Sequence, residues 1–158
     1  MSATLRARSV ALPLMIVVVL VASMLALAPP ADAAKRGQRV SHAVQVVKNQ
    51  KGDAYRYGAA GPNRFDCSGL VYFSYRKAGF TNIPRTSGAQ ARFADRVKRK
   101  NMRKGDLMFF YDGGGVYHVA VFTGWNNGRR KMIHAPYGGK RVHRAGPWTN
   151  KWFAGTLR

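Results

Sequence analysis

The spacing of apolar residues predicts three helices in the first half of the chain. One helix covers residues 40–51, where apolar side chains recur every three or four positions and Gly52 follows as a stop. A second covers residues 67–78, with Asp66 at the position of an N-cap. A short third helix begins at Thr86. The segment between the first two helices is rich in Gly and Tyr, which indicates a loop.

The second half of the chain changes to short apolar runs bounded by glycine, which is typical of β-strands. The expected strands are residues 107–111, 116–123, 131–134, 141–143 and 152–157. A strongly basic connector at residues 96–104 separates them from the helices. Helices followed by antiparallel strands predict an α+β domain.

The N-terminal residues have the pattern of a secretory signal peptide. Arg6 and Arg8 form its basic region, and residues 10–28 form an apolar run. Ala31, Asp32 and Ala33 then place small residues at the two specificity positions of a signal peptidase. An uncleaved membrane anchor is the alternative, because the run is nearly long enough to span a bilayer. The small residues and the two preceding prolines favour cleavage.

The predicted organisation is a signal peptide at residues 1–33, a basic leader at 34–43 and a folded domain at 44–158. This order predicts a secreted protein of the cell wall or the extracellular space. Residues 35–39 are expected to be disordered. The remaining length suffices for one hydrophobic core, and we expect a monomer. Because the chain has a single cysteine, its stability cannot rest on an internal disulfide.

The charge balance is extreme, with 27 Lys and Arg against 6 acidic residues and a net charge of +21. Such a field favours a polyanionic neighbour. For an exported protein the candidates are anionic wall polymers, membrane surfaces and extracellular nucleic acid. The chain has no recognisable nucleic-acid motif, so we expect no specific nucleic-acid partner. Wall polymers bound through the basic surface are the favoured interpretation.

The single cysteine, Cys67, falls at the first turn of the second predicted helix. A thiolate is stabilised at a helix N-terminus by unpaired N–H groups and the macrodipole. The same N–H groups can hold an oxyanion during acyl transfer. The alternative is a small buried hydrophobic residue, which is common for a free cysteine.

Two of the four histidines are candidates for the base that a cysteine nucleophile needs. His118 and His134 lie on consecutive predicted strands joined by a hairpin. Pairing symmetric about Asn126 would place the two imidazoles directly opposite each other, with Cβ atoms about 5 Å apart. A two-residue turn at Asn127 and Gly128 would instead place His118 opposite residue 137. The other histidines, His42 and His143, are expected to be surface residues.

Several segments together resemble the NlpC-type cell-wall endopeptidases. They are residues 52–58 (GDAYRYG), 65–71 (FDCSGLV), 84–87 (PRTS), 105–110 (GDLMFF), 118–122 (HVAVF) and 132–136 (MIHAP). The order of these segments is the order of the family, and the resemblance runs from about residue 44 to the C-terminus. Two departures are Tyr57, where the family more often has Trp, and Ala59, where a second Gly is common. These departures bear on substrate subsites.

The resemblance implies a papain-like α+β fold with helices packed on a small antiparallel sheet. It also implies hydrolysis of an amide next to D-glutamate in peptidoglycan stem peptides, through a thioester. Carried over by position, Cys67 is the nucleophile, His118 the general base and His134 the polar residue that orients His118. No cofactor is expected. No metal is expected either, because no cluster in the sequence has metal-ligand spacing.

The resemblance also places three substrate-binding residues near the thiol. They are Tyr55, Asp66 and Ser68. In relatives that need a free stem N-terminus, the positions of Asp66 and Ser68 are linked to recognition of the amine. Asp66 could instead only cap the helix.

Other functions remain open at this level. A cell-wall amidase or an acyltransferase on the same fold would use the same Cys and His geometry. A basic wall-binding protein without activity is a third alternative. Trp148, Trp152 and Phe153 are interpreted as core and rim residues.

Overall fold

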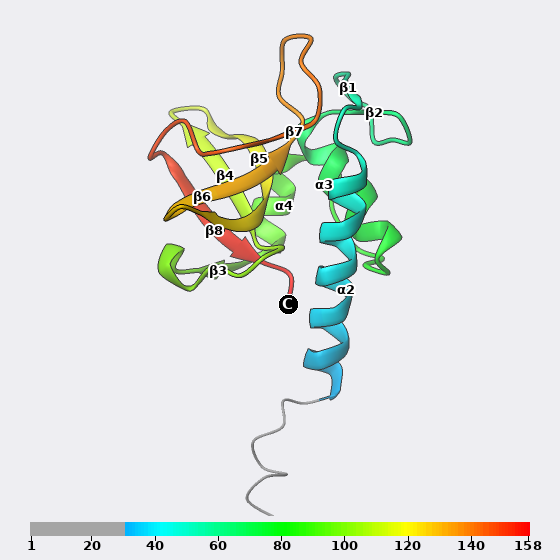
Figure 1. The fold of residues 1–158 in the computed structure, drawn as a ribbon, viewed down its shortest axis with the longest axis vertical. Coiled ribbons are helices and arrows are strands. Elements are labelled where there is room, and N and C mark those ends of the chain that lie inside the picture. The colour runs from blue at the N-terminus through cyan, green and yellow to red at the C-terminus, as the bar shows by residue number, and fades with distance from the viewer. Residues whose placement is uncertain (1–30) are drawn as a thin grey trace, which may run out of the picture. The chain divides into compact units, whose positions relative to one another are not determined.

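A six-stranded sheet with helices against one face makes up residues 31–158, the part of the chain that the computed structural model describes (Figure 1). The arrangement confirms the predicted α+β class. Residues 1–30 of the predicted signal peptide lie outside the described residues. Within residues 31–158, no helix has the length and apolar character needed to cross a membrane.

The helices follow the predicted pattern with one correction at the N-terminus. They are α2 (Ala31–Asn49), α3 (Cys67–Lys77) and α4 (Ser87–Phe93), with a short 3₁₀ helix, η1 (Arg99–Asn101). The predicted apolar face of α2 is buried, at Val40, Ala43, Val44 and Val47. Because α2 begins at Ala31, residues 35–39 are helical and the prediction of a disordered leader is wrong. Lys, Arg and Gln are good helix formers, and no proline interrupts the segment.

The main sheet has the strand order β3-β8-β4-β5-β6-β7, and all its pairs are antiparallel. Its strands are β3 (Asp95–Val97), β4 (Leu107–Asp112), β5 (Gly115–Asn126), β6 (Arg129–His134), β7 (His143–Ala145) and β8 (Trp152–Thr156). Strand β3 lies in the segment predicted as a basic connector, and it pairs with β8 at the sheet edge. A separate parallel pair, β1 (Ala54–Tyr55) and β2 (Arg64–Phe65), was not predicted in the Gly/Tyr loop.

Alternation along the strands produces two buried faces. One face carries Leu107, Phe109, Val119 and Val121, and packs against apolar residues of α2 and α3. The other face carries Met108, Phe110, Ala120, Phe122 and Met132, with Met102 and Trp152 packed among them. Burial on both faces explains why these strands appear as continuous apolar runs in the sequence.

The β5–β6 hairpin has the two-residue turn at Asn127 and Gly128 that one sequence alternative predicted, but its register differs by one residue beyond a bulge. Asn126 pairs with Arg129 around a two-residue turn in which Asn127 and Gly128 have positive φ. Symmetric pairing about Asn126 is therefore wrong. A β-bulge between Phe122 and Gly124 then shifts the register by one residue, so that Phe122 pairs with Met132.

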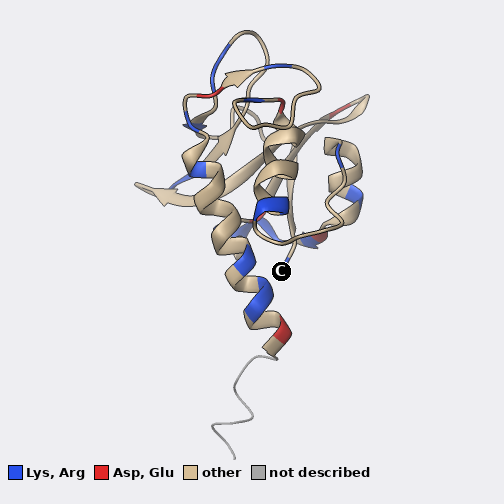
Figure 2. Cartoon of the chain, turned by 90° about the vertical axis from the view of Figure 1, so that its right-hand side faces the viewer, with Lys and Arg blue, Asp and Glu red and all other residues tan. Residues whose placement is uncertain are grey.

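Lys and Arg far outnumber acidic residues over α2 and the loops (Figure 2). Among the described residues only two ion pairs form, Arg85 with Asp66 and Arg158 with Asp106. Most basic side chains of the described chain therefore carry an uncompensated positive charge.

Candidate active site

Cys67 is the first residue of α3, as its neighbours in the sequence predict. The N-cap is Asp66, whose side chain accepts a hydrogen bond from the backbone N–H of Gly69 at 2.6 Å. The loop before α3 is hydrogen-bonded to the start of the helix, because the N–H of Asp66 donates to the carbonyl of Ala59 at 2.9 Å. A Cβ at Gly69 would overlap that carbonyl oxygen, so only glycine allows the loop to lie this close to the first turn.

The Asp66 carboxylate is fully occupied by donors from the protein. Besides Gly69, it accepts from the N–H of Gly58 at 2.9 Å and from the hydroxyl of Ser68 at 3.2 Å. The Arg85 guanidinium donates to both carboxylate oxygens, at 3.0 and 2.7 Å. Burial alone would raise the pKa of Asp66, but these donors and the positive charge of Arg85 lower it. Asp66 is therefore an ionised helix cap that forms a salt bridge with Arg85.

The thiol of Cys67 has a raised pKa, which corrects the expectation from its helix position. Burial is the main cause, and the negative charge of Asp66 adds to it. The backbone N–H groups of Val119, Ser68 and Cys67 itself act in the opposite direction. Because burial outweighs these N–H groups, the resting thiol keeps its proton and needs a base to remove it.

The two predicted histidines form a pair. Nε2 of His118 on β5 lies 3.0 Å from Nδ1 of His134 on β6, and the rings are nearly perpendicular. Burial lowers the pKa of His118 to about 4. Burial, together with the charges of His118, His143 and Lys140, lowers the pKa of His134 to about 3. Both imidazoles are therefore neutral at neutral pH, as a general base must be.

The hydrogen bond between the rings determines which nitrogen can act. For His118 to accept a proton at Nδ1, its Nε2 must carry hydrogen and donate to Nδ1 of His134. His134 then carries its own hydrogen on Nε2, a buried atom with no hydrogen-bond partner among the described residues. In this tautomer, Nδ1 of His118 is the nitrogen that can accept a proton.

Two adjoining clefts meet at the thiol. One, of about 380 Å³, is lined by Cys67, His118 and His134, and by Tyr55, Tyr57, Tyr117, Pro136, Tyr137 and Trp148. The other, of about 440 Å³, is lined by Asp66, Ser68, Arg85, Thr86 and Ser87. Tyr55, Tyr57, Tyr117 and Cys67 line both. Cys67 therefore lies where the two clefts join.

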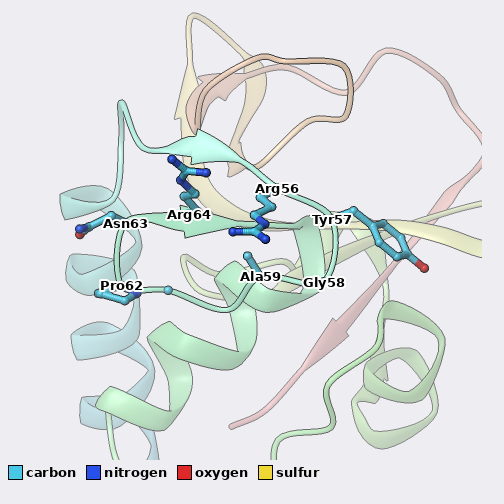
Figure 3. A pocket seen from close by; sticks show the side chains of 8 residues that line it. Arg56, Tyr57, Gly58, Ala59, Pro62, Asn63 and Arg64 are labelled. Carbon is cyan, nitrogen blue, oxygen red and sulfur yellow. The ribbon is translucent and has the colours of Figure 1, made fainter.

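A third cavity lies in the loop that joins β1 to β2 (Figure 3). It is lined by residues 56–59 and 61–64. The Tyr57 side chain points away from Arg56 and Arg64, and it belongs to both clefts at the thiol as well. This loop therefore contributes Tyr57 to the site.

The model of the NlpC/P60 family matches residues 52–157, two thirds of the chain and every element that lines the clefts. The chain belongs to the NlpC/P60 family. The predicted papain-like α+β fold is confirmed, because the solved structures that the chain resembles include NlpC/P60 domains.

Two curated relatives show how the NlpC/P60 domain is used elsewhere. The chain is 41% identical over 106 residues to the probable endopeptidase p60 of Listeria innocua, a match that covers 64% of this chain and 22% of p60. It is 37% identical over 121 residues to the murein DD-endopeptidase MepH of Escherichia coli, a match that covers 71% of this chain and 42% of MepH. The chain thus matches less than half the length of either relative.

A solved structure supports the same assignment. The peptidoglycan hydrolase RipB of Mycobacterium tuberculosis is 27% identical, with a TM-score of 0.67, and the match covers 83% of this chain and 73% of RipB. The likeness extends over nearly all the described elements.

All six site residues predicted from the sequence lie around the two clefts of this NlpC/P60 domain. Their chemical roles stay predictions. Two residues were missed: Arg85, which was quoted only as part of a family motif, and Trp148, which was read as core and rim. His143 is exposed as expected, but its ring also lies 4.9 Å from that of His134. No three His, Cys, Asp or Glu residues in the described chain are arranged to hold a metal.

Proposed function

We propose that this chain is a secreted cysteine endopeptidase that hydrolyses amide bonds in peptidoglycan stem peptides, next to D-glutamate. The observation that carries the proposal is one cleft lined by Cys67 at the start of α3 and by the hydrogen-bonded pair of His118 and His134. A nucleophile, a base and an orienting group are the three parts that covalent acyl transfer requires.

The first half of the reaction forms a thioester. Nδ1 of His118 removes the thiol proton of Cys67 as the sulfur attacks the carbonyl carbon of the scissile amide. The N–H groups of Cys67 and Ser68, which oppose the rise in the pKa of the thiol, stabilise the oxyanion. His118 then gives its proton to the amide nitrogen, the C–N bond breaks and the amine leaves.

The second half returns the enzyme to its resting state. Neutral His118 removes a proton from water, and the hydroxide attacks the thioester carbonyl. The C–S bond breaks and the product carboxylic acid forms, which loses its proton to solvent, while the proton on His118 returns to the sulfur. In both halves the hydrogen bond from Nε2 of His118 to His134 holds the ring in one orientation while it is positively charged.

The names of the relatives support the substrate class. MepH is named a murein endopeptidase and RipB a peptidoglycan hydrolase, and p60 a probable endopeptidase. MepH is named a DD-endopeptidase, whereas the resemblance of the motifs implies cleavage next to D-glutamate. The cleaved bond therefore needs a direct measurement.

Mass spectrometry of muropeptides after incubation of purified wall with the protein provides that measurement. We expect products cut next to D-glutamate, and no products with Cys67→Ala, a change that removes one thiol and little packing. Cleavage between sugar and peptide would indicate an amidase, and peptide exchange would indicate an acyltransferase. A folded wild-type protein that binds wall and releases nothing would indicate the inactive wall-binding alternative.

We further propose that the basic surface holds the secreted enzyme on anionic wall polymers. Lys98 and Lys100 project from the segment before β4, and both are exposed. Neither takes part in an ion pair among the described residues. A dense, uncompensated positive charge raises the local concentration of a polyanion without specifying its sequence.

A further inference from the structure

Trp148 lies over the imidazole pair. It belongs to the loop between β7 and β8, far in sequence from both histidines. Its ring centroid is 5.3 Å from that of His118 and 5.4 Å from that of His134. It also stacks on Phe110, with the ring centroids 4.2 Å apart and an angle of 7° between the ring planes. One indole therefore touches three rings around the base.

The exposure of these residues shows what the indole does. Trp148 itself is 52% exposed, whereas His118 is 8% and His134 4% exposed. Phe110 is fully buried and pairs across the sheet with His118, so it gives the indole a rigid support. A half-exposed tryptophan that lines the Cys67 cleft thus packs on two almost fully buried imidazoles.

We propose that Trp148 is a positioning residue, which fixes the planes of His118 and His134 and keeps water away from their shared hydrogen bond. This inference rests on the proposed role of His118 as general base. Trp148 takes no proton and forms no bond to the substrate in this role. The indole acts through packing, and a wide aromatic ring is needed to cover both imidazoles at once.

The consequence is a base that works in mildly acidic solution. Burial keeps His118 neutral well below the ordinary histidine pKa of about 6.5. The titratable groups around the pair come from several elements. They are Cys67 from α3, Tyr55 from β1, Tyr57 from the loop after β1, Tyr117 from β5, His143 from β7, and Tyr137 and Lys140 from the loop before β7. None of these groups is a carboxylate that would favour the imidazolium. Opening the pair to water should therefore raise the pKa of His118.

The first test is the pH dependence of hydrolysis of a soluble stem peptide by Trp148→Ala and Trp148→Phe. For Trp148→Ala we expect the acidic limb of the pH profile of kcat/KM to move up by about one to two pH units, toward the ordinary pKa of histidine. The rate at pH 5.5 should then fall by up to about fourfold more than the rate at pH 8, because a large share of His118 is protonated at the lower pH. Trp148→Phe should shift less, since it keeps an aromatic ring on Phe110.

Trp125→Ala is the matched control, because Trp125 is 48% exposed and packs on Phe122 and Arg130 rather than on the histidines. Its acidic limb should match that of the wild type. An unmoved acidic limb in Trp148→Ala overturns the inference. A raised KM with an unmoved limb also overturns it, because Trp148 would then be a substrate contact.

The second test does not depend on activity. NMR titration of the histidine ring signals should show two imidazole pKa values rising toward about 6.5 in Trp148→Ala and not in Trp125→Ala. If Trp148→Ala does not fold, the same titration of Trp148→Leu tests the inference, because leucine covers less of the two imidazoles than tryptophan does. Unchanged pKa values of the two imidazoles would reject the positioning role of Trp148. A wild-type protein that hydrolyses no stem peptide would reject the proposed function, while the titration would still test the shielding.

Discussion

Nε2 of His118 and Nδ1 of His134 lie 3.0 Å apart, although the two residues are not directly opposite each other in the sheet. Extending the register of Val121 with Ile133 places His118 opposite Pro136, so His134 is its diagonal neighbour. Residues two apart on a strand share a face. The bulge at Thr123 is therefore what brings the rings to the same face, because without it the turn would place them on opposite faces.

The imidazole pair predicts unequal losses for its two members. His118→Ala should reduce kcat by about 10²- to 10⁴-fold, the usual contribution of a general base. His134→Ala should lose less, because the base remains and only its orientation suffers. His134→Asn should recover part of that loss, since the amide oxygen can accept the hydrogen bond from His118. Steady-state kinetics on a stem peptide measure all three, and wild-type rates in both alanine variants would reject the pair as catalytic machinery.

The Asp66 network predicts a structural role for this carboxylate. Both oxygens accept hydrogen bonds, so Asp66→Asn turns one acceptor into a donor that faces other donors. We expect a loss of about 1–3 kcal/mol in the free energy of unfolding, measured by urea denaturation. Asp112→Asn is the control, because one oxygen of Asp112 accepts from Gly114 in an exposed turn that asparagine can also form.

The same network predicts that the site does not read a free amine. With Arg85 bound to Asp66, the carboxylate has no free charge for a substrate ammonium. Wild-type enzyme should therefore cleave free and N-acetylated stem peptides with similar KM. A sharply higher KM for the acetylated peptide would instead support the amine-binding role of Asp66 and Ser68.

The basic surface predicts salt-dependent adsorption. Binding to purified wall should weaken steeply as salt rises, because screening shortens the range of the field. Lys98→Gln with Lys100→Gln should weaken binding and leave turnover of a soluble stem peptide unchanged. Arg99 is left intact, because it donates to the carbonyls of Asn150 and Trp152 and supports the fold. Adsorption that does not respond to salt would show that charge is not the anchor.

The buried imidazoles predict that stability falls with acid. The folded-state pKa values of His118 and His134 lie below the unfolded value of about 6.5, so their full contribution is present above that pH. As pH falls, the unfolded chain binds protons that the folded chain does not, down to about pH 4 for His118 and about pH 3 for His134. The free energy of unfolding should therefore drop by at most about 1.4 kcal/mol per pH unit for each imidazole.

Urea denaturation at pH 7, 6 and 5 measures this slope. The double variant His118→Gln/His134→Gln should have a flatter dependence on pH than the wild type. His42→Gln, at an exposed position of α2, should keep the wild-type slope. Equal slopes in all three proteins would show that the buried pair does not govern acid stability.

The sequence by itself determined the features that depend on local pattern. Helical spacing predicted the buried face of α2, and Asp66 followed by Cys67 predicted a capped helix with the thiol in its first turn. Motif order also identified the family, because each motif is a short contiguous segment. These features need only neighbours along the chain.

The tertiary structure decided what depends on distant neighbours. The pairing of the histidines depends on a one-residue bulge, which no local pattern marks. The raised pKa of Cys67 depends on burial that overcomes the helix N-terminus, and the state of Asp66 depends on Arg85 from another segment. Trp148 reaches the imidazoles from the loop before the last strand. Burial and side-chain packing sum over the whole fold, so they could be found only in three dimensions.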